Sequence, residues 1–429
     1  MHKSIYSLLL LGMSQTVTAQ EAPLSQPSTA PSSQPTSAPA TAPVKPVTPK
    51  KEAPKLSKTL AIGSQGKIKF GGLFQGWFDS NTTADKFTAN EDAINTFRVR
   101  RAEFSLSGDV IPERFSFKVM TDFAKGLFNQ DKQTVVTSVI TDPITGEVTT
   151  TTTTLTGVKA DNIVPVRDLY GVIKTKHADL WFGQYKIPLS LEGNGSPAQL
   201  LLPERSVAAK AFGDKRDFGL KVEKRFEEFQ NALYSVGVFN GSGENRLDTD
   251  PIKDLMWRFE AIPNLGPAKV LVAFVGAQSL TGDDLQASRR LLEGDLRVNV
   301  GPLVLQAEVF SQKSRVVSAD GIAPATPKDA LGFYVSAGFQ QNNFLVAGRF
   351  GTFDPDTAVA PADDDAQLTE LGASASYFLW RDNKKTSPLF SEHPEIHEAK
   401  IQVGYSHFAP TNTANQATDE LIVALQSWF

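Results

Sequence analysis

From Lys67 onward, apolar and polar residues alternate along the chain with a period of two. The alternation is clearest over 114–123, where odd positions are mostly apolar and even positions mostly polar, and it recurs in Leu255–Ala261 and in 303–312. Successive side chains of a β-strand point to opposite faces, so each window predicts a strand with one apolar face. A soluble β-sandwich would show the same alternation, so these windows alone do not decide where the sheet resides.

The connections between the predicted strands are more informative than the strands themselves. Short connections such as Asp109–Glu113, Lys176–His177 and Asn299–Pro302 alternate with much longer segments, and residues 381–395 are the exception because that connection should be short. Tight turns at one end, long loops at the other and an even number of strands are typical of outer-membrane β-barrels. The pattern predicts sixteen strands, starting near residues 67, 97, 114, 166, 178, 217, 230, 254, 268, 289, 302, 330, 343, 368, 396 and 418.

The first sixty residues predict export and a spacer. His2 and Lys3 precede the apolar stretch Ile5–Met13, and a small-x-small site ends at Ala19, so residues 1–19 are expected to be a cleaved signal peptide. Residues 20–60 are rich in Pro, Ala, Ser and Thr and have too little apolar surface to order themselves. They predict a disordered periplasmic tether, either a passive spacer or a segment that contacts the cell wall.

The last strand ends on an aromatic residue. Leu421–Phe429 resembles the C-terminal signal by which the barrel assembly machinery recognises outer-membrane barrels, with Phe429 as the insertion signal. The predicted fold for 61–429 is therefore all-β, a 16-stranded antiparallel transmembrane β-barrel preceded by the disordered Pro/Ala/Ser/Thr-rich segment. The expected location is the outer membrane of a Gram-negative bacterium.

Composition and charge narrow the possible functions. The chain has no cysteine, which excludes thiolate metal sites, thiol nucleophiles and disulfides. Residues 1–60 hold 6 of the 43 basic and 2 of the 47 acidic residues, so 61–429 carry 37 minus 45, a net charge of −8. This balance disfavours nucleic acid as a partner. It also means that any anion preference must come from where the positive charges lie.

Several segments resemble the phosphate-selective porin O and P family. The resemblance is dense over residues 67–260, and it implies a sixteen-stranded, usually trimeric porin. The positive charge that phosphate-specific members place along the lumen has no residue-by-residue match in the second half of this chain. The segments that carry the resemblance are Phe97–Gly108, Phe117–Ala124, Val166–Tyr170, Gly183–Glu192, Leu202–Ser206 and Arg216–Gly219.

Positive charge on the early strands provides candidate pore residues. The parity of apolar positions shifts after Arg101, so a β-bulge is expected near Arg100–Arg101 that turns the arginines toward the water-filled side. Two interpretations stay open: an arginine row that steers anions, or arginines paired with lumenal acids such as Glu103 and Asp122. The pore-lining candidates are Arg98, Arg100, Lys118, Asp122 and Arg167.

The connection Pro188–Arg216 is the expected constriction loop. In porins of the resembled type, the third external loop folds into the barrel and narrows it; the alternative is a loop packed at the mouth. Mixed charges suit an eyelet with a transverse field. The candidate residues of this loop are Glu192, Glu204, Arg205, Lys210, Lys215 and Arg216.

The predicted function is a passive channel for small hydrophilic solutes, with anions such as phosphate as the expected cargo. A general or cation-preferring porin is the first alternative, and a structural or adhesive surface barrel is the second. The scattered histidines form no catalytic or metal-binding motif, so no enzyme, cofactor or metal is expected. Expected partners are outer-membrane lipid and lipopolysaccharide, the barrel assembly machinery and two further copies of the chain in a homotrimer.

Overall fold

The computed structural model describes residues 59–62, 66–81, 94–127, 134–141, 148–155, 165–248, 251–281, 287–316, 326–360, 367–380, 398–412 and 417–428. The predicted signal peptide, nearly all of the predicted tether and Phe429 lie outside these residues.

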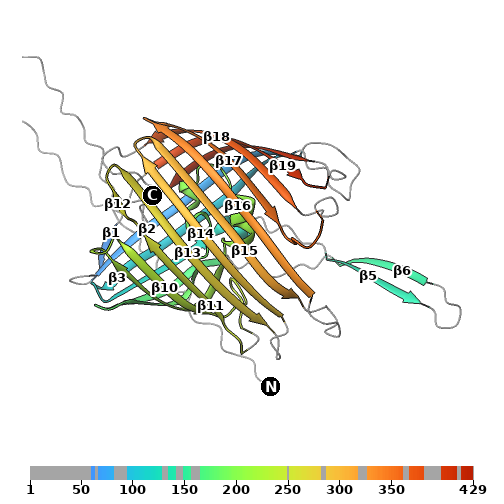
Figure 1. Ribbon diagram of the computed structural model, residues 1–429, viewed down its shortest axis with the longest axis horizontal. Coiled ribbons are helices and arrows are strands. Elements are labelled where there is room, and N and C mark those ends of the chain that lie inside the picture. Colours follow the sequence, from blue (N-terminus) through green and yellow to red (C-terminus); the bar gives the residue numbers. More distant parts are fainter. Residues whose placement is uncertain are drawn as a thin grey trace, which may run out of the picture. The chain divides into compact units, whose positions relative to one another are not determined.

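The main sheet closes on itself. It holds 18 strands, and β2 pairs with both β3 and β20, so the first and last long strands meet. Two strands are short additions, β1 (Thr59–Ile62) beside β2 and β12 (Asn264–Leu265) beside β13. The other sixteen are antiparallel neighbours around the barrel, which confirms the predicted number (Figure 1). They are β2 (Gly66–Asn81), β3 (Ile94–Ile111), β4 (Phe115–Asp122), β7 (Val166–Lys174), β8 (Asp179–Lys186), β9 (Arg216–Phe226), β10 (Ala232–Phe239), β11 (Asp254–Ala261), β13 (Ala268–Thr281), β14 (Ala287–Val300), β15 (Leu303–Val316), β16 (Thr326–Gln341), β17 (Phe344–Asp354), β18 (Leu368–Trp380), β19 (Glu398–Pro410) and β20 (Thr418–Trp428).

The two faces of the wall have opposite chemistry. Along β18, Leu371 and Tyr377 are exposed on the outer face, whereas Glu370, Ser374 and Ser376 are buried on the inner face. A soluble protein would bury the apolar face, but a membrane barrel presents it to lipid. Lipid offers no hydrogen-bond partner, so closure of the sheet is what satisfies the backbone of every strand. Sixteen strands enclose a lumen wide enough for water and solutes.

Tight turns join strands at one end of the barrel, which we call the turn end. Glu113, Gly301 and Asn342 adopt positive φ angles of 60°, 54° and 52° in the turns that follow β3, β14 and β16. The tight turns that join the two strands of a β-hairpin use this left-handed geometry, which glycine and asparagine adopt most easily. The opposite end, where the longer connections lie, is called the loop end below.

Helices are few and short in the described part of the chain: α1 (Phe123–Leu127), α2 (Leu191–Asn194), the 3-10 helix η1 (Pro197–Gln199) and α3 (Val207–Phe212). None of them has the length and apolar character needed to cross a membrane. Between β4 and β7, strands β5 (Thr134–Thr141) and β6 (Val148–Leu155) form a separate two-stranded ribbon.

Candidate functional site

The connection between β8 and β9 lies against the inner face of the barrel, and we call residues 187–215 the inner loop. Three consecutive residues of the inner loop, 201–203, each lie against a glycine of the wall whose side chain, if present, would point into the barrel. A Cβ atom at Gly338 would lie 3.2 Å from Leu201, one at Gly372 2.5 Å from Leu202, and one at Gly404 2.5 Å from the Pro203 ring. The missing side chains allow the inner loop to touch the backbone of the wall.

This close approach predicts the effect of a wall substitution. Gly404→Val should push Pro203 away from β19, because overpacking a tight contact costs about 1–3 kcal/mol. We expect a lower thermal unfolding temperature and larger current fluctuations in planar bilayers. Gly348→Val is the matched control, since the nearest atom to a Cβ there, the carbonyl oxygen of Gly372, is 3.7 Å away. Equal effects of the two substitutions would contradict the contact.

Polar wall residues hold the same part of the inner loop. Ser374 and Gln402 donate hydrogen bonds of 2.7 Å and 2.9 Å to the carbonyl oxygen of Leu201, and Gln426 donates one of 3.0 Å to that of Ala198. These carbonyls have no helix or sheet partner, so inward-facing side chains satisfy them. The first half of the inner loop is thereby fixed to β18, β19 and β20.

The second half of the inner loop packs through aromatic contacts. Phe212 of α3 stacks on Phe310 of β15, with ring centroids 5.2 Å apart, and meets Phe353 edge-on at 5.5 Å. A Cβ at Gly332 would be 3.0 Å from both Ala208 and Phe212, so another inward glycine admits α3. Ala208, Phe212 and Phe310 are almost completely buried.

A buried charge network joins the inner loop to three strands. Arg349 of β17 donates a 2.6 Å hydrogen bond to Glu192 of the loop and a 3.0 Å hydrogen bond to Glu370 of β18. Glu370 also accepts from the backbone N–H of Val207. Glu308 of β15 accepts from the N–H groups of Leu191 and Glu192 at 3.0 Å and 2.7 Å. Each buried charge thus has a partner, as a low-dielectric site requires.

Glu204 connects the inner loop to the arginines of β3. Its carboxylate lies 2.7 Å from Arg100, 3.8 Å from Arg101 and 3.5 Å from Lys210. Burial raises the pKa of Glu204, but the charges of Lys210, Arg100 and Arg101 lower it more, so the pKa lies well below its usual value. Glu204 therefore stays ionised at neutral and mildly acidic pH.

The arginines reach this position through an irregularity in β3. The register with β2 shifts between Gln75 and Gly76, which leaves Arg100 without a partner across the sheet. The predicted bulge is confirmed. Arg98 pairs with Asp79, and both Arg98 and Arg100 lie over the Trp77 ring, at 5.2 Å and 5.5 Å from its centroid. The arginines are therefore paired with acids, as one of the two interpretations expected, but the partners are Asp79 and Glu204 and not Glu103 and Asp122.

Asp168 of β7 forms a second bridge between the wall and the end of the inner loop. Lys118 lies 2.9 Å from one of its oxygens and Arg216 lies 2.8 Å from the other. Lys118 belongs to β4 and Arg216 begins β9, so one carboxylate links three strands. Arg216 is buried, whereas Lys118 is partly exposed.

The cations and acids of these pairs differ in exposure. The side chains of Arg98, Arg100, Lys118 and Lys210 are 30–44% exposed, whereas their acidic partners Asp79, Glu204 and Asp168 are 7–13% exposed. Water in the lumen therefore meets the positive member of each pair. The order is reversed in other pairs: Asp214 is more exposed than Arg205 and Lys186, Glu244 is more exposed than Arg167, and Glu223 is more exposed than Lys221.

The other candidates from the sequence have different surroundings. Asp122 is buried and accepts hydrogen bonds from the N–H groups of Ala102 and Ala124, so it does not line the pore. Arg167 pairs with Glu244.

The remaining candidates belong to the inner loop. Glu192 and Arg205 are buried and stabilise it, and Arg205 donates hydrogen bonds to the carbonyls of Glu192 and Gly195. Burial and the neighbouring Arg289 lower the pKa of Lys215.

Sequence reasoning missed the residues of the wall that receive the inner loop. Glu308, Arg349 and Glu370 are single charges in the inward register of β15, β17 and β18, and Gly338, Gly372 and Gly404 are inward glycines on β16, β18 and β19. A glycine repeated in the inward register of neighbouring strands signals close approach of another backbone. That signal was present in the sequence.

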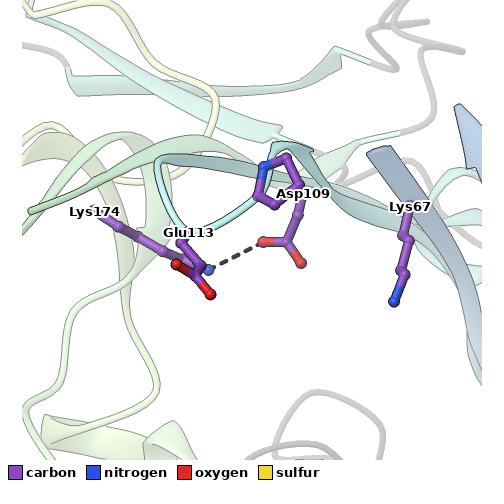
Figure 2. Close-up of a pocket in the computed structure, with 5 residues that line it drawn as sticks. Lys67, Asp109, Glu113 and Lys174 are labelled. Atoms are coloured by element: carbon purple, nitrogen blue, oxygen red, sulfur yellow. Dashed lines mark hydrogen bonds and ion pairs between the residues drawn. The ribbon is translucent and has the colours of Figure 1, made fainter. Parts of the chain in front are cut away.

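A shallow hollow lies apart from the lumen, at the turn end. It is lined by Lys67, Asp109, Pro112, Glu113 and Lys174, and Figure 2 shows Lys174 and Asp109 joined across it while Lys67 points away. The ion pair is 3.0 Å long and its two side chains are well exposed. Exposed pairs of this kind contribute little to stability. Among the described residues, no group of three acidic or histidine side chains has the arrangement of a metal site.

A closed barrel with a lipid-facing outer surface, a charged lumen and a loop packed inside it defines an outer-membrane porin. A sequence model of the phosphate-selective porin O and P family matches residues 73–298, which is 226 of the 429 residues. The chain belongs to this family and resides in the outer membrane of a Gram-negative bacterium. No curated protein sequence gives a significant match.

Solved porin structures share the fold. The outer membrane channel DcaP of Acinetobacter baumannii is 11% identical, covers 86% of this chain and 99% of its own, and gives a TM-score of 0.52. OmpF of Salmonella typhi, in complex with daunomycin, is 12% identical over 85% and 98% of the two chains, with a TM-score of 0.50. An anion-selective porin from Comamonas acidovorans is 8% identical over 85% and 100%, with a TM-score of 0.49. At such identities the likeness establishes the fold alone.

Proposed function

We propose that the protein is a diffusion porin that prefers small anions, with phosphate among its solutes. The observation that carries this proposal is the unequal exposure within the lumenal ion pairs of Arg98, Arg100, Lys118 and Lys210. A solute in the lumen therefore contacts these cations more readily than the acids that pair with them, because the acids are more deeply buried. The name of the family agrees with an anion preference.

The inner loop is the proposed constriction. It crosses from the β18–β20 wall, where Leu201 and Ala198 are bound, to β3, where Glu204 meets Arg100. Such a bridge narrows the lumen and places Lys210 and Arg100 beside the same carboxylate. Water is scarcer at a constriction than in bulk, so exposed charges there act more strongly on a passing ion.

The negative net charge of the chain supports a competing function, a cation-preferring porin. Some of the acids are buried beside arginines: Glu293 and Asp295 lie in the inner wall beside Arg258, and Glu192 and Glu370 are bound by Arg349. Buried acids that are paired with an arginine present little net charge to a passing ion. For this reason we favour the anion preference.

Phosphate itself provides the test of the solute class. We expect inorganic phosphate to reduce the chloride current of the wild-type channel in a planar bilayer, since a multivalent anion is retained longer by the lumenal cations than chloride. Arg100→Gln should weaken this block. Gly348→Val, on the outer face, is the control that should leave it unchanged. A chloride current insensitive to phosphate would remove phosphate from the proposal and leave a general anion porin.

The remaining expectations for cell biology are part of the same proposal. Residues 1–19 direct export, residues 20–60 form a periplasmic tether that either spaces the barrel or contacts the cell wall, and Phe429 is read by the barrel assembly machinery. A homotrimer is the expected assembly, as the family resemblance implies. Cross-linking in intact outer membranes tests the number of copies.

A further inference from the structure

Three basic side chains lie close together on the outer face of the barrel near the loop end. Arg290 of β14 and Lys313 of β15 are directly opposite each other in the sheet, and Arg315 is two residues further along β15. All three are exposed. They follow the same register as Leu292 and Val309, which are exposed on the lipid-facing surface. We call Arg290, Lys313 and Arg315 the outer basic cluster.

The position of the cluster along the membrane normal follows from the strand geometry. From Val300 at the turn end to Arg290, β14 advances 300 − 290 = 10 residues, which at about 3.4 Å per residue is about 34 Å of strand. A tilt of about 35–45° reduces this to a height of about 24–28 Å, the same as the apolar band of about 25 Å in outer-membrane barrels. The outer basic cluster therefore lies where the hydrocarbon ends and the headgroups of the outer leaflet begin.

The cluster keeps a net positive charge. Asp329 of β16 is the cross-strand neighbour of Lys313, but among the described residues no ion pair joins it or another acid to Arg290, Lys313 or Arg315. Like charges directly opposite each other destabilise a sheet, and cross-strand neighbours have Cβ atoms about 4.5–5.5 Å apart. A bound anion of more than one charge would relieve this repulsion.

Other parts of the barrel wall do not have this feature. At the loop end of β17–β20, the outward positions of the described strands carry no lysine or arginine; they include Thr352, Asp354, Thr369 and Asp419. His407 and Tyr405 of β19 both contact Asp419 and so are already engaged. The outer basic cluster thus has no counterpart at the loop end of the described residues of β17–β20.

We infer that the outer basic cluster binds the phosphates of lipid A, the phosphorylated lipid of lipopolysaccharide in the outer leaflet. Both parts of such a lipid find a complement on the same strands. Its phosphates meet Arg290, Lys313 and Arg315, and its acyl chains lie on the exposed side chains of Leu292, Val309 and Leu331 below them. Guanidinium groups suit phosphate because they donate paired hydrogen bonds. Free phosphate would gain only the charge contacts, so the lipid is the occupant.

The test measures lipid retention and not conduction, so its outcome is separate from that of the proposed channel function. The full-length protein in detergent is titrated with lipid A, with dephosphorylated lipid A and with inorganic phosphate, and bound lipid is counted by native mass spectrometry. The outer triple variant combines Arg290→Gln, Lys313→Gln and Arg315→Gln. A turn-end triple variant, Arg114→Gln, Lys176→Gln and Lys224→Gln, removes the same charge from the opposite end.

The wild type and the turn-end triple variant should bind lipid A with the same affinity. The outer triple variant should bind it at least about tenfold more weakly, because each basic residue near an anionic surface contributes substantially to the binding free energy. Dephosphorylated lipid A should bind the wild type as weakly as lipid A binds the outer triple variant. Lys313→Gln alone, with a smaller loss, replaces the triple variant if circular dichroism shows that the triple variant is not folded. Equal binding by wild type and outer triple variant, or displacement of lipid A by inorganic phosphate at equal concentration, would overturn the inference.

Discussion

Replacing Arg349 with alanine is expected to loosen the inner loop and to destabilise the barrel by about 3–5 kcal/mol, the usual cost of removing one partner from a buried ion pair. The arginine binds Glu192 of the loop and Glu370 of the wall, and all three side chains are almost fully buried. Without it two carboxylates remain buried with no cation between them. Thermal unfolding in detergent should shift to lower temperature, and single-channel conductance in bilayers should rise as the loop leaves the lumen.

Lys174→Ala is the control for this experiment. It removes the ion pair between Lys174 and Asp109, whose side chains are 37% and 41% exposed, and exposed pairs contribute about 0–1 kcal/mol. If Arg349→Ala unfolds no earlier than Lys174→Ala and conducts like the wild type, the buried network does not hold the loop.

The second large effect is expected from removing positive charge in the lumen. A lumen triple variant with Arg98→Gln, Arg100→Gln and Lys118→Gln leaves Asp79, Glu204 and Asp168 without these cations. One charge acting over about 4 Å in water is worth about 1 kcal/mol, roughly a fivefold change in local ion concentration. We expect the ratio of chloride to potassium permeability to fall by at least this factor, as read from the reversal potential in a potassium chloride gradient.

The turn-end triple variant distinguishes the effect of where the positive charges lie from the effect of the net charge of the protein. It loses the same three positive charges outside the lumen, so its permeability ratio should equal that of the wild type. A similar fall in both triple variants would mean that the net charge of the protein, and not the exposed lumenal cations, sets the selectivity. High salt should reduce the difference between the variants, because exposed charges are screened.

The strand plan was predictable because a membrane barrel repeats one rule in every strand. Alternation in windows such as Leu255–Ala261 and the short connections around Asn299–Pro302 were enough to place sixteen strands, and the change of parity after Arg101 was enough to place the bulge. Each of these features is local: two neighbouring residues, or one turn, carry the information.

The partners of the lumenal charges were not predictable in the same way. Arg100 meets Glu204, 104 positions away, and Arg349 meets Glu192, 157 positions away. Alternation shows which face a residue occupies but not which residue of the loop lies opposite it. The path of the inner loop depends on glycines in three different strands, and their common role emerges only when Gly338, Gly372 and Gly404 are seen against consecutive loop residues.

The central claim is that the exposed members of the lumenal ion pairs make the channel prefer anions although the chain is negatively charged. The most direct measurement is the reversal potential of the purified wild-type protein in a planar bilayer under a potassium chloride gradient. We predict the sign of a chloride-selective channel, with phosphate reducing the current. A potassium-selective reversal potential would contradict it, and would show that the buried and partly buried acids, not Arg98, Arg100, Lys118 and Lys210, govern the lumen.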